Sequence, residues 1–373
     1  MSYSFENMSP QEIYAKLANT TSIDYFIRKY NIPDYETALG IIEMCNLNGF
    51  ELETYMKDDI MYIAKPKMTR LNVTPPSLDD PTVTNLKIMV IADTHYGNKG
   101  QQWHLVREAY LDAQEWGADV IFHLGDLHDG LYPDRKETPR QQIFRGFDQQ
   151  VLFTRLAHPR VERLYKRTDP LKITSPAIRN LKLSDKYIPT IAILGSHDET
   201  SYKNGMATAD VWLTETRGED MTFIGQDSGI VTINGVKFLL DHPGGGKAKA
   251  VSYSIQKRME EADNTDIAAV LTGHYHTIWF GISPKGTYGF CVGSMCDRTQ
   301  FQNKKILKND VGYLKLDLWT KDGKIIAQTP EMVYYDQNDM WDESRGVGKQ
   351  KCLKLMRDDG VDMKKMRDIC GYY

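Results

Sequence analysis

The stretch ILGSHDE, residues 193–199, is the part of the sequence that decides the fold. It continues the apolar run IPTIAIL, residues 188–194, into a glycine, a serine, a histidine and two acids. A short apolar run of this kind predicts a buried strand, so the polar residues lie at its carboxyl end. In open α/β sheets, ligand groups gather at the carboxyl ends of the strands. The stretch therefore predicts a functional site at the rim of a sheet.

Four other stretches of the chain have the same form. Apolar runs lead into ADTH at 92–95, GDLHD at 125–129, DHPGGG at 241–246 and GHYH at 273–276. Together with GSHD, these stretches hold six of the nine histidines. Segments with a helical pattern, such as HLVREAYLDAQEWG, separate these stretches. This alternation indicates a layered α/β fold. The candidate site residues are Asp93, His95, Asp126, Asp129, Ser196, His197, Asp198, His242, His274 and His276.

The types and spacing of these residues point to a metal centre. Side chains two residues apart on extended backbone face the same way, which pairs Asp93 with His95 and His274 with His276. Imidazole and carboxylate groups suit Mn, Fe and Zn. A carboxylate shared by two ions would hold them about 3.5–4 Å apart, the spacing used in two-metal hydrolysis. One such pair alone is more often a hydrogen-bonded turn, but five elements in order favour a metal site.

The composition sets further limits. The 373 residues include 41% hydrophobic residues and carry a net charge of −4, which gives no overall attraction to polyanions. The polar start MSYSFENMSPQE has no apolar segment of a signal peptide, and no apolar run predicts a membrane helix. We expect a soluble, cytoplasmic protein without membrane contact. The cysteines are too scattered for a disulfide framework: Cys45, Cys291, Cys296, Cys352 and Cys370.

The chain divides into four expected parts. Residues 1–65 are predicted to form three helices and a hairpin, the layout of a winged helix-turn-helix. Residues 66–86 are rich in Pro, Thr and Asp and form the expected linker. Residues 87–330 hold the candidate site. Residues 331–373 are expected to be an appended C-terminal segment whose charged sequence predicts helix.

The expected winged helix leaves two interpretations open. DNA binding is the obvious one, yet residues 1–65 contain five Lys or Arg and ten Asp or Glu. A helix that contacts phosphates is expected to be more basic. The charge therefore favours contact with a protein partner, or self-association, through residues 1–65.

Residues 131–190 form a basic insertion within the main domain. They contain thirteen Lys or Arg and six Asp or Glu. Much of this positive charge lies in residues 139–167, which are predicted to be helical. The insertion lies between GDLHD and GSHD, so we expect a basic face beside the metals that suits nucleic acid. A solvated helix without a binding role is the alternative.

In their order, the motifs D-x-H, G-D-x-x-D, G-N-H-[D/E], H and G-H-x-H resemble the signature of the calcineurin-like metallophosphoesterases. The resemblance spans residues 87–330 and departs from the pattern at Ser196, where the family has Asn. It implies a four-layer α/β/β/α sandwich, of the α/β (α+β) class, with two metal ions at its rim. One ion would take Asp93, His95 and His276, Asp126 would bridge, and the other ion would take His242, His274 and the Ser196 position.

The resemblance also assigns residues to the reaction. His197 matches the histidine that contacts the scissile phosphate and assists the leaving group, and Asp198 matches the acid that orients it. The segment GFCVGSMCDRTQF, residues 289–301, resembles a turn of the SbcD-type DNA-repair nucleases, which makes Arg298 a candidate phosphate contact. His128 neighbours the site and is a candidate substrate contact. Structural roles for Arg298 and His128 are the alternatives.

These observations lead to one expected function. The chain is expected to be a dinuclear metal-dependent nuclease or phosphodiesterase that hydrolyses nucleic acid, DNA above all, through a metal-bridging hydroxide. Mn²⁺ is the expected metal, with Fe, Zn and Mg²⁺ as alternatives. The rival functions are a phosphomonoesterase acting on proteins or nucleotides and a non-catalytic binding subunit. With Ser in the place of Asn, we expect a working enzyme with one weakened metal site.

Overall fold

The computed structural model describes residues 8–18, 20–65, 77–133, 138–144, 146–178, 181, 184–245, 251–336, 339–340 and 347–370. The chain divides into two compact units, Met1–Pro75 and Pro76–Tyr373, which we call the small unit and the large unit. Residues 66–76 of the expected linker lie outside the described residues, as do parts of the basic insertion and of the C-terminal segment.

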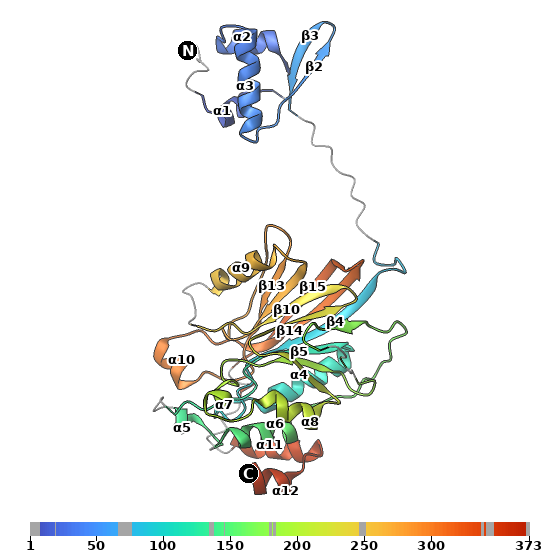
Figure 1. The fold of residues 1–373 in the computed structure, drawn as a ribbon, viewed down its shortest axis with the longest axis vertical. Helices are drawn as coiled ribbons and strands as arrows, with labels where there is room; N and C mark the ends of the chain where they lie inside the picture. Colours follow the sequence, from blue (N-terminus) through green and yellow to red (C-terminus); the bar gives the residue numbers. More distant parts are fainter. Residues whose placement is uncertain are drawn as a thin grey trace. The chain divides into compact units, whose positions relative to one another are not determined.

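The small unit consists of three helices and a three-stranded sheet (Figure 1). Its first helix begins with a capping box, in which the side chains of Ser9 and Glu12 each accept a hydrogen bond from the other residue's backbone amide. Ile23, Phe26 and Ile41 are among its buried core residues. The three expected helices and the expected hairpin are present together with a short strand β1, in this order: α1 (Pro10–Lys16), β1 (Thr20–Ser22), α2 (Ile23–Tyr30), α3 (Tyr35–Leu47), β2 (Glu53–Lys57) and β3 (Ile60–Ala64).

Two six-stranded sheets form the centre of the large unit. The first sheet has the order β15-β14-β4-β5-β7-β8, with parallel pairing from β4 to β8. Its strands are β4 (Thr84–Ile91), β5 (Val120–Leu124), β7 (Thr190–Ile193), β8 (Met221–Gly225), β14 (Val311–Lys321) and β15 (Lys324–Tyr335). The second sheet has the order β12-β13-β11-β10-β9-β6, in which β10, β11 and β13 are parallel. Its strands are β6 (Ile173–Thr174), β9 (Ser228–Ile233), β10 (Val236–Asp241), β11 (Ile267–Thr272), β12 (Trp279–Ile282) and β13 (Tyr288–Cys291).

The main apolar core lies between the two sheets. Phe122 of β5 and Phe238 of β10 meet there, with their ring centroids 6.0 Å apart. Side chains alternate along a strand, so Val90 of β4 faces this core while Met89 faces the helical side. Both faces of the central strands are therefore buried, as expected of a parallel sheet covered on both sides.

Helices cover the outer face of each sheet (Figure 1). Helix α9 (Val251–Ala262) packs on β11 and β13 through Ile255 and Met259. Helices α4 (Trp103–Trp116), α6 (Phe147–Ala157) and α8 (Ala209–Arg217) cover the other sheet. This arrangement confirms the predicted four-layer α/β/β/α sandwich.

The C-terminal segment is part of the large unit's core, which corrects its description as an appendage. Strand β15 continues past residue 330, so the expected boundary at 331 falls inside a strand. Three elements follow: α11 (Val347–Asp358), α12 (Met363–Lys365) and the π-helical turn η3 (Met366–Cys370). Cys352, Met356 and Met366 are fully buried in one apolar cluster with Phe147 of α6. The charged residues that suggested an appendage are the solvent face of this amphipathic segment.

The basic insertion differs from the expectation in two ways. Among the described residues of the insertion, helix is confined to α5 (Thr138–Gln141) and α6, and α6 ends at Ala157 because Pro159 disfavours helical backbone at the preceding His158. In addition, the guanidinium groups of Arg163 and Arg167 donate hydrogen bonds to Asp119, the residue before β5. The metal-site loop follows the other end of that strand. These two arginines therefore do not build the basic face that we expected beside the metals.

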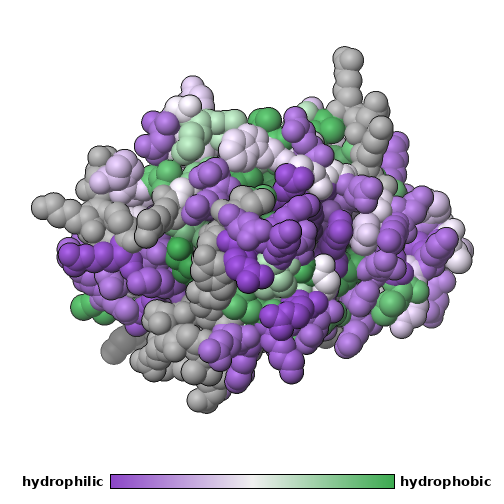
Figure 2. All heavy atoms as spheres, turned by 90° about the horizontal axis from the view of Figure 1, so that it is seen from below, coloured by the Kyte–Doolittle hydropathy of each residue, from purple (hydrophilic) through white to green (hydrophobic). Residues whose placement is uncertain are grey.

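Figure 2 shows a face covered mostly by hydrophilic residues, with hydrophobic residues in small separate patches. Within the described ranges, none of the helices has the length and apolar character needed to cross a membrane. Four of the described cysteines are buried: Cys45, Cys291, Cys296 and Cys352.

Candidate metal centre

The loops that follow five strands bring the predicted ligands together at one rim of the large unit. Asp93 follows β4, Asp126 follows β5 and His197 follows β7 in the first sheet. His242 follows β10, and His274 and His276 follow β11 in the second sheet. The loops are tied to one another, because the amides of Asp93 and His95 donate to the carbonyls of Gly125 and Asp126 at 3.0 Å each. Parallel pairing thus places the side chains from both sheets at a common edge.

Several of the predicted ligands have left-handed rather than extended backbone, and this conformation directs their side chains toward the site. Five of the eleven described non-glycine residues with positive φ are predicted ligands. This conformation costs about 1–2 kcal/mol for a residue with a side chain, and Asp and His tolerate it better than most. The two-residue spacing therefore works through turns, which corrects the expectation of strand alternation. The five residues are Asp93 (φ 54°), His95 (43°), Asp126 (49°), His274 (71°) and His276 (47°).

Two glycines allow the loops to approach one another. A Cβ atom on Gly195 would overlap the backbone nitrogen and the carboxylate of Asp126. A Cβ atom on Gly125, which has a φ of +85°, would lie 2.7 Å from Nδ1 of His242. Any larger residue at these positions would displace a predicted ligand.

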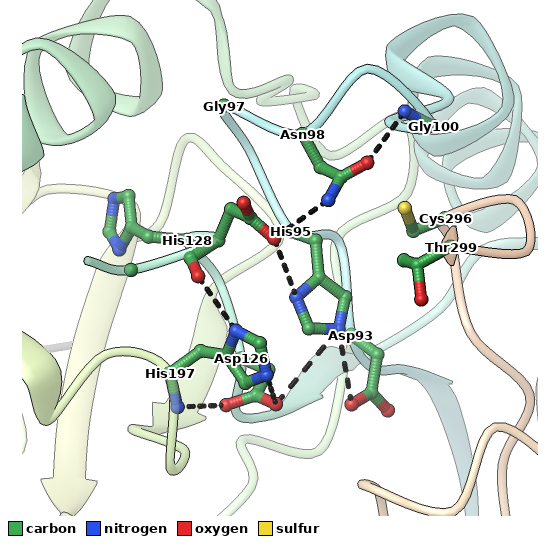
Figure 3. A network of polar contacts seen from close by, with 12 residues as sticks. Asp93, His95, Gly97, Asn98, Gly100, Asp126, His128, His197, Cys296 and Thr299 are labelled. Carbon is green, nitrogen blue, oxygen red and sulfur yellow. Dashed lines mark hydrogen bonds and ion pairs between the residues drawn. The ribbon is translucent and has the colours of Figure 1, made fainter. Parts of the chain in front are cut away.

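The first group of ligand atoms comprises Asp93, His95 and His276. Nε2 of His276 lies 3.2 Å from Oδ1 of Asp93 and 3.2 Å from Nε2 of His95 (Figure 3 shows His95 and Asp93). Burial and the neighbouring His197 hold the pKa of His95 well below its usual value, so this ring is neutral. A neutral imidazole is the form that binds a metal.

The second group comprises Asp126, His242 and His274. Nδ1 of His242 lies 2.7 Å from the Leu124 carbonyl and donates to it, so its Nε2 faces Oδ2 of Asp126 at 3.1 Å. Burial opposes the ionised carboxyl, yet His242 and His197 hold the pKa of Asp126 well below its usual value. The same oxygen lies 3.9 Å from Nε2 of His95. The Asp126 carboxylate is therefore within reach of both groups.

The residues present fit two divalent cations. Nδ1 of His95 is buried without a hydrogen-bond partner among the described residues, which is costly unless a ligand satisfies it, and Nε2 of His242 faces only the Asp126 carboxylate at 3.1 Å. Each group offers carboxylate oxygen and imidazole nitrogen, the donors that divalent transition metals prefer. A third group, His95, Asp129 and His197, extends the first one. Sequence reasoning had placed Asp129 at the site without a role.

His197 is held by the neighbouring loop rather than by Asp198. Its Nδ1 donates to the backbone oxygen of Asp129 at 2.7 Å, and its backbone amide donates to Oδ1 of Asp126 at 2.8 Å. Its Nε2 lies 4.0 Å from Oδ2 of Asp126, on the side of the metal groups (Figure 3). A carbonyl oxygen can only accept, so Nδ1 carries a proton and Nε2 is the atom available to substrate.

Asp198 and His128 are structural, which corrects both predictions. The Asp198 carboxylate is fully buried and accepts from the amides of Leu127, His128 and Gly195 at 2.9–3.0 Å. It also lies 2.8 Å from Nδ1 of His128, whose Nε2 is 2.8 Å from the Thr154 hydroxyl. Asp198 therefore ties two metal-binding loops together, and a fully buried His128 with both ring nitrogens bonded cannot touch substrate.

A cavity of about 650 Å³ adjoins the metal groups. Ser196 lines it. Arg298, the predicted phosphate contact, is exposed and is not among the residues that line this cavity. The cations on the wall are instead Lys203 of α7 (Thr200–Lys203), Lys305 of α10 (Gln300–Lys305) and Lys308. None of these lysines lies in a motif, so only the fold identifies them.

The fold and this site together define a phosphoric ester hydrolase with divalent metal ions. Residues 86–281, more than half of the chain, match the family model of the calcineurin-like phosphoesterases. The chain therefore belongs to the calcineurin-like phosphoesterase family. No curated protein matches the chain.

The chain is similar to solved structures at low sequence identity. An archaeal phosphodiesterase is 16% identical, with 66% of this chain and 100% of that chain covered and a TM-score of 0.36. Yfce, a phosphoesterase from E. coli, is 15% identical, with coverages of 65% and 98% and a TM-score of 0.30. Vps29 from Entamoeba histolytica, in complex with Zn²⁺, is 14% identical, with coverages of 67% and 100% and a TM-score of 0.30.

Proposed function

We propose that this phosphoester hydrolase is a phosphodiesterase that cleaves nucleic acid. The observation that carries the proposal is the cavity beside the metal groups, with Lys203, Lys305 and Lys308 on its wall. Its volume of about 650 Å³ exceeds what one phosphate needs and leaves room for groups on both sides of a diester. Aromatic rings of Tyr132 and Phe301 also line it, and such rings stack on nucleobases.

The cavity lysines pair with protein carboxylates that the phosphates of a polyanion could replace. Lys203 lies 3.2 Å from Glu199, and Lys308 lies 2.7 Å from Asp310. The Lys203 and Lys308 side chains are more than 60% exposed, although the Asp310 carboxylate is only 12% exposed. Solvent screening keeps the Lys203 pair at about 1 kcal/mol or less, so a phosphate backbone can displace Glu199 at little cost.

The residues around the reacting phosphate have separate tasks. Two cations held by the two groups, Mn²⁺ in this proposal, would neutralise the anionic diester and lower the pKa of the attacking water. Ser196, which lines the cavity in the place of the family's Asn, would complete the surroundings of the second ion. In the protonated state, His197 offers Nε2–H to the leaving oxygen as its bond to phosphorus breaks, while the Asp129 carbonyl keeps the ring oriented.

For the small unit we propose contact with a protein partner rather than with DNA. The exposed residues of α3 include Glu36, Leu39, Glu43 and Leu47. Acidic and apolar side chains do not neutralise phosphates, whereas exposed apolar residues are typical of protein interfaces.

The test compares diester, monoester and nucleic-acid substrates. With added Mn²⁺, we expect hydrolysis of bis(p-nitrophenyl) phosphate in preference to p-nitrophenyl phosphate, and cleavage of single- or double-stranded DNA or RNA. His197→Ala should lower the rate by about 100-fold or more. Turnover of the monoester without any cleavage of nucleic acid would instead identify a phosphomonoesterase. No hydrolysis of any phosphoester by the metal-loaded protein would leave only the binding-subunit alternative.

A further inference from the structure

Two amide side chains, one buried and one half-buried, form a polar cluster behind His276 that is not part of any motif. Asn309 and Gln302 come from the region of α10, and both contact the ring of His276 on the side away from the metal groups. Nε2 of this ring faces Asp93 at 3.2 Å, so Nδ1 is the atom toward the cluster. The two amides therefore contact the back of a predicted ligand.

The orientation of the Asn309 amide follows from its partners. Its Nδ2 donates to the Cys296 carbonyl at 3.2 Å, which leaves Oδ1 to face Nδ1 of His276 at 2.8 Å. An amide oxygen can only accept, so Nδ1 of His276 carries the proton. The lone pair is then on Nε2, where a cation beside Asp93 and His95 needs it.

The Gln302 amide is oriented by the start of α10. Its Oε1 accepts from the backbone amide of Thr299 at 2.8 Å and from the Thr299 hydroxyl at 3.2 Å, as part of a capping box. Its Nε2 consequently points inward and donates to Oδ1 of Asn309 at 2.9 Å. That oxygen has two lone pairs and can accept from both Gln302 and His276. Nε2 of Gln302 also lies 2.6 Å from Nδ1 of His276, so this amide contacts the ring directly as well as through Asn309.

We propose that Asn309 and Gln302 are positioning residues that fix the tautomer and the ring orientation of His276 for metal binding. Gln302 lies on α10 between Phe301 and Lys305, which both line the cavity. The capping box of α10 therefore joins the substrate wall and the metal centre in one hydrogen-bond network. This inference concerns the metal site and does not depend on which phosphoester is the substrate.

The test measures metal binding directly. Metal-free protein is titrated with Co²⁺ by calorimetry and by its visible absorption, and Asn309→Leu is compared with the wild type. We expect Co²⁺ affinity to fall by about 10- to 100-fold with a changed absorption spectrum, the usual effect of removing a ligand's hydrogen-bond partner. Asn309→Asp keeps the acceptor oxygen and should restore affinity to within about threefold. Asn303→Ala, an exposed residue on the same helix, is the matched control.

Two outcomes would overturn the proposal. One is wild-type Co²⁺ affinity and spectrum in Asn309→Leu. The other is an Asn309→Asp variant that is folded but binds as weakly as Asn309→Leu, because the side chain would then act through packing alone. If Asn309→Leu does not fold, Gln302→Met decides, since it keeps the length of the side chain. We expect weaker Co²⁺ binding by Gln302→Met, and unchanged binding would contradict its assigned role.

Discussion

At the scale of single residues, backbone carbonyls decide which imidazole nitrogens remain available. The Leu124 carbonyl accepts from Nδ1 of His242, and the Asp129 carbonyl accepts from Nδ1 of His197. In each ring the opposite nitrogen, Nε2, faces the site. Fixed tautomers mean that little side-chain rearrangement is needed when a cation binds.

Ser196 gives the sharpest prediction for one residue. It occupies the Asn position of the family pattern and lines the cavity. A serine side chain is shorter and presents a hydroxyl instead of an amide carbonyl. Ser196→Asn should therefore lower the Mn²⁺ concentration needed for half-maximal hydrolysis of bis(p-nitrophenyl) phosphate. An unchanged metal requirement would show that Ser196 does not weaken the site.

At the scale of elements, the close approach of the β5 and β7 loops depends on Gly195. In Gly195→Ala, the added methyl group would meet the amide and carboxylate of Asp126. We expect chemical denaturation to show a loss of about 1–3 kcal/mol, together with weaker Mn²⁺ binding. Gly40→Ala on α3 is the control, because its Cβ meets nothing within 4 Å and should be neutral or stabilising. Equal effects of the two substitutions would contradict the close-approach argument.

Helix α4 carries a pH-sensitive contact at His104. Its Nε2 donates to the Asp339 carbonyl at 2.7 Å, and burial lowers the pKa of His104 to about 4. Because the folded pKa lies below the unfolded value, this stability is fully present above pH 6.5 and is lost as the pH falls toward 4. The loss amounts to about 3 kcal/mol at most.

Urea denaturation of metal-free protein at pH 7.0, 5.5 and 4.5 checks this expectation. His104→Gln keeps a hydrogen-bond donor but cannot titrate, so its free energy of unfolding should fall less steeply than that of the wild type. Parallel pH profiles for the two proteins would assign the acid sensitivity to other groups.

The elements also show how far the sequence could predict this site. The metal ligands follow apolar runs in a fixed order, so their meeting at one rim was predictable from strand pairing. The histidine that binds Asp198 was not predictable, because His128 and His197 are both expected near its carboxylate. The packing of the loops decides that the partner is His128. Asn309 and the cavity lysines lie outside any motif and reach the site through tertiary folding alone. Similarly, the count of basic residues in 131–190 could not reveal that Arg167 binds Asp119.

At the scale of the whole molecule, binding of a polyanion should depend on cations at the cavity rather than on net charge. We expect Lys305→Ala to raise KM for nucleic acid and to leave KM for bis(p-nitrophenyl) phosphate unchanged. The slope of log KM against log salt should fall by about 0.7–0.9, the value for one lost phosphate contact. Lys304→Ala, a neighbouring exposed lysine that does not line the cavity, is the control. The same salt slope in both variants would show that Lys305 does not contact the nucleic acid.

The two groups at the rims of the two sheets, with Asp126 within reach of both, would hold two cations that supply the Lewis acidity for the hydrolysis. Titration of metal-free protein with Mn²⁺, with bound metal and hydrolysis of bis(p-nitrophenyl) phosphate measured in the same samples, tests this assignment most directly. We predict two Mn²⁺ per chain, with activity rising only as the second, weaker site beside Ser196 fills. Full activity at one Mn²⁺ per chain, or hydrolysis without bound metal, would contradict the account.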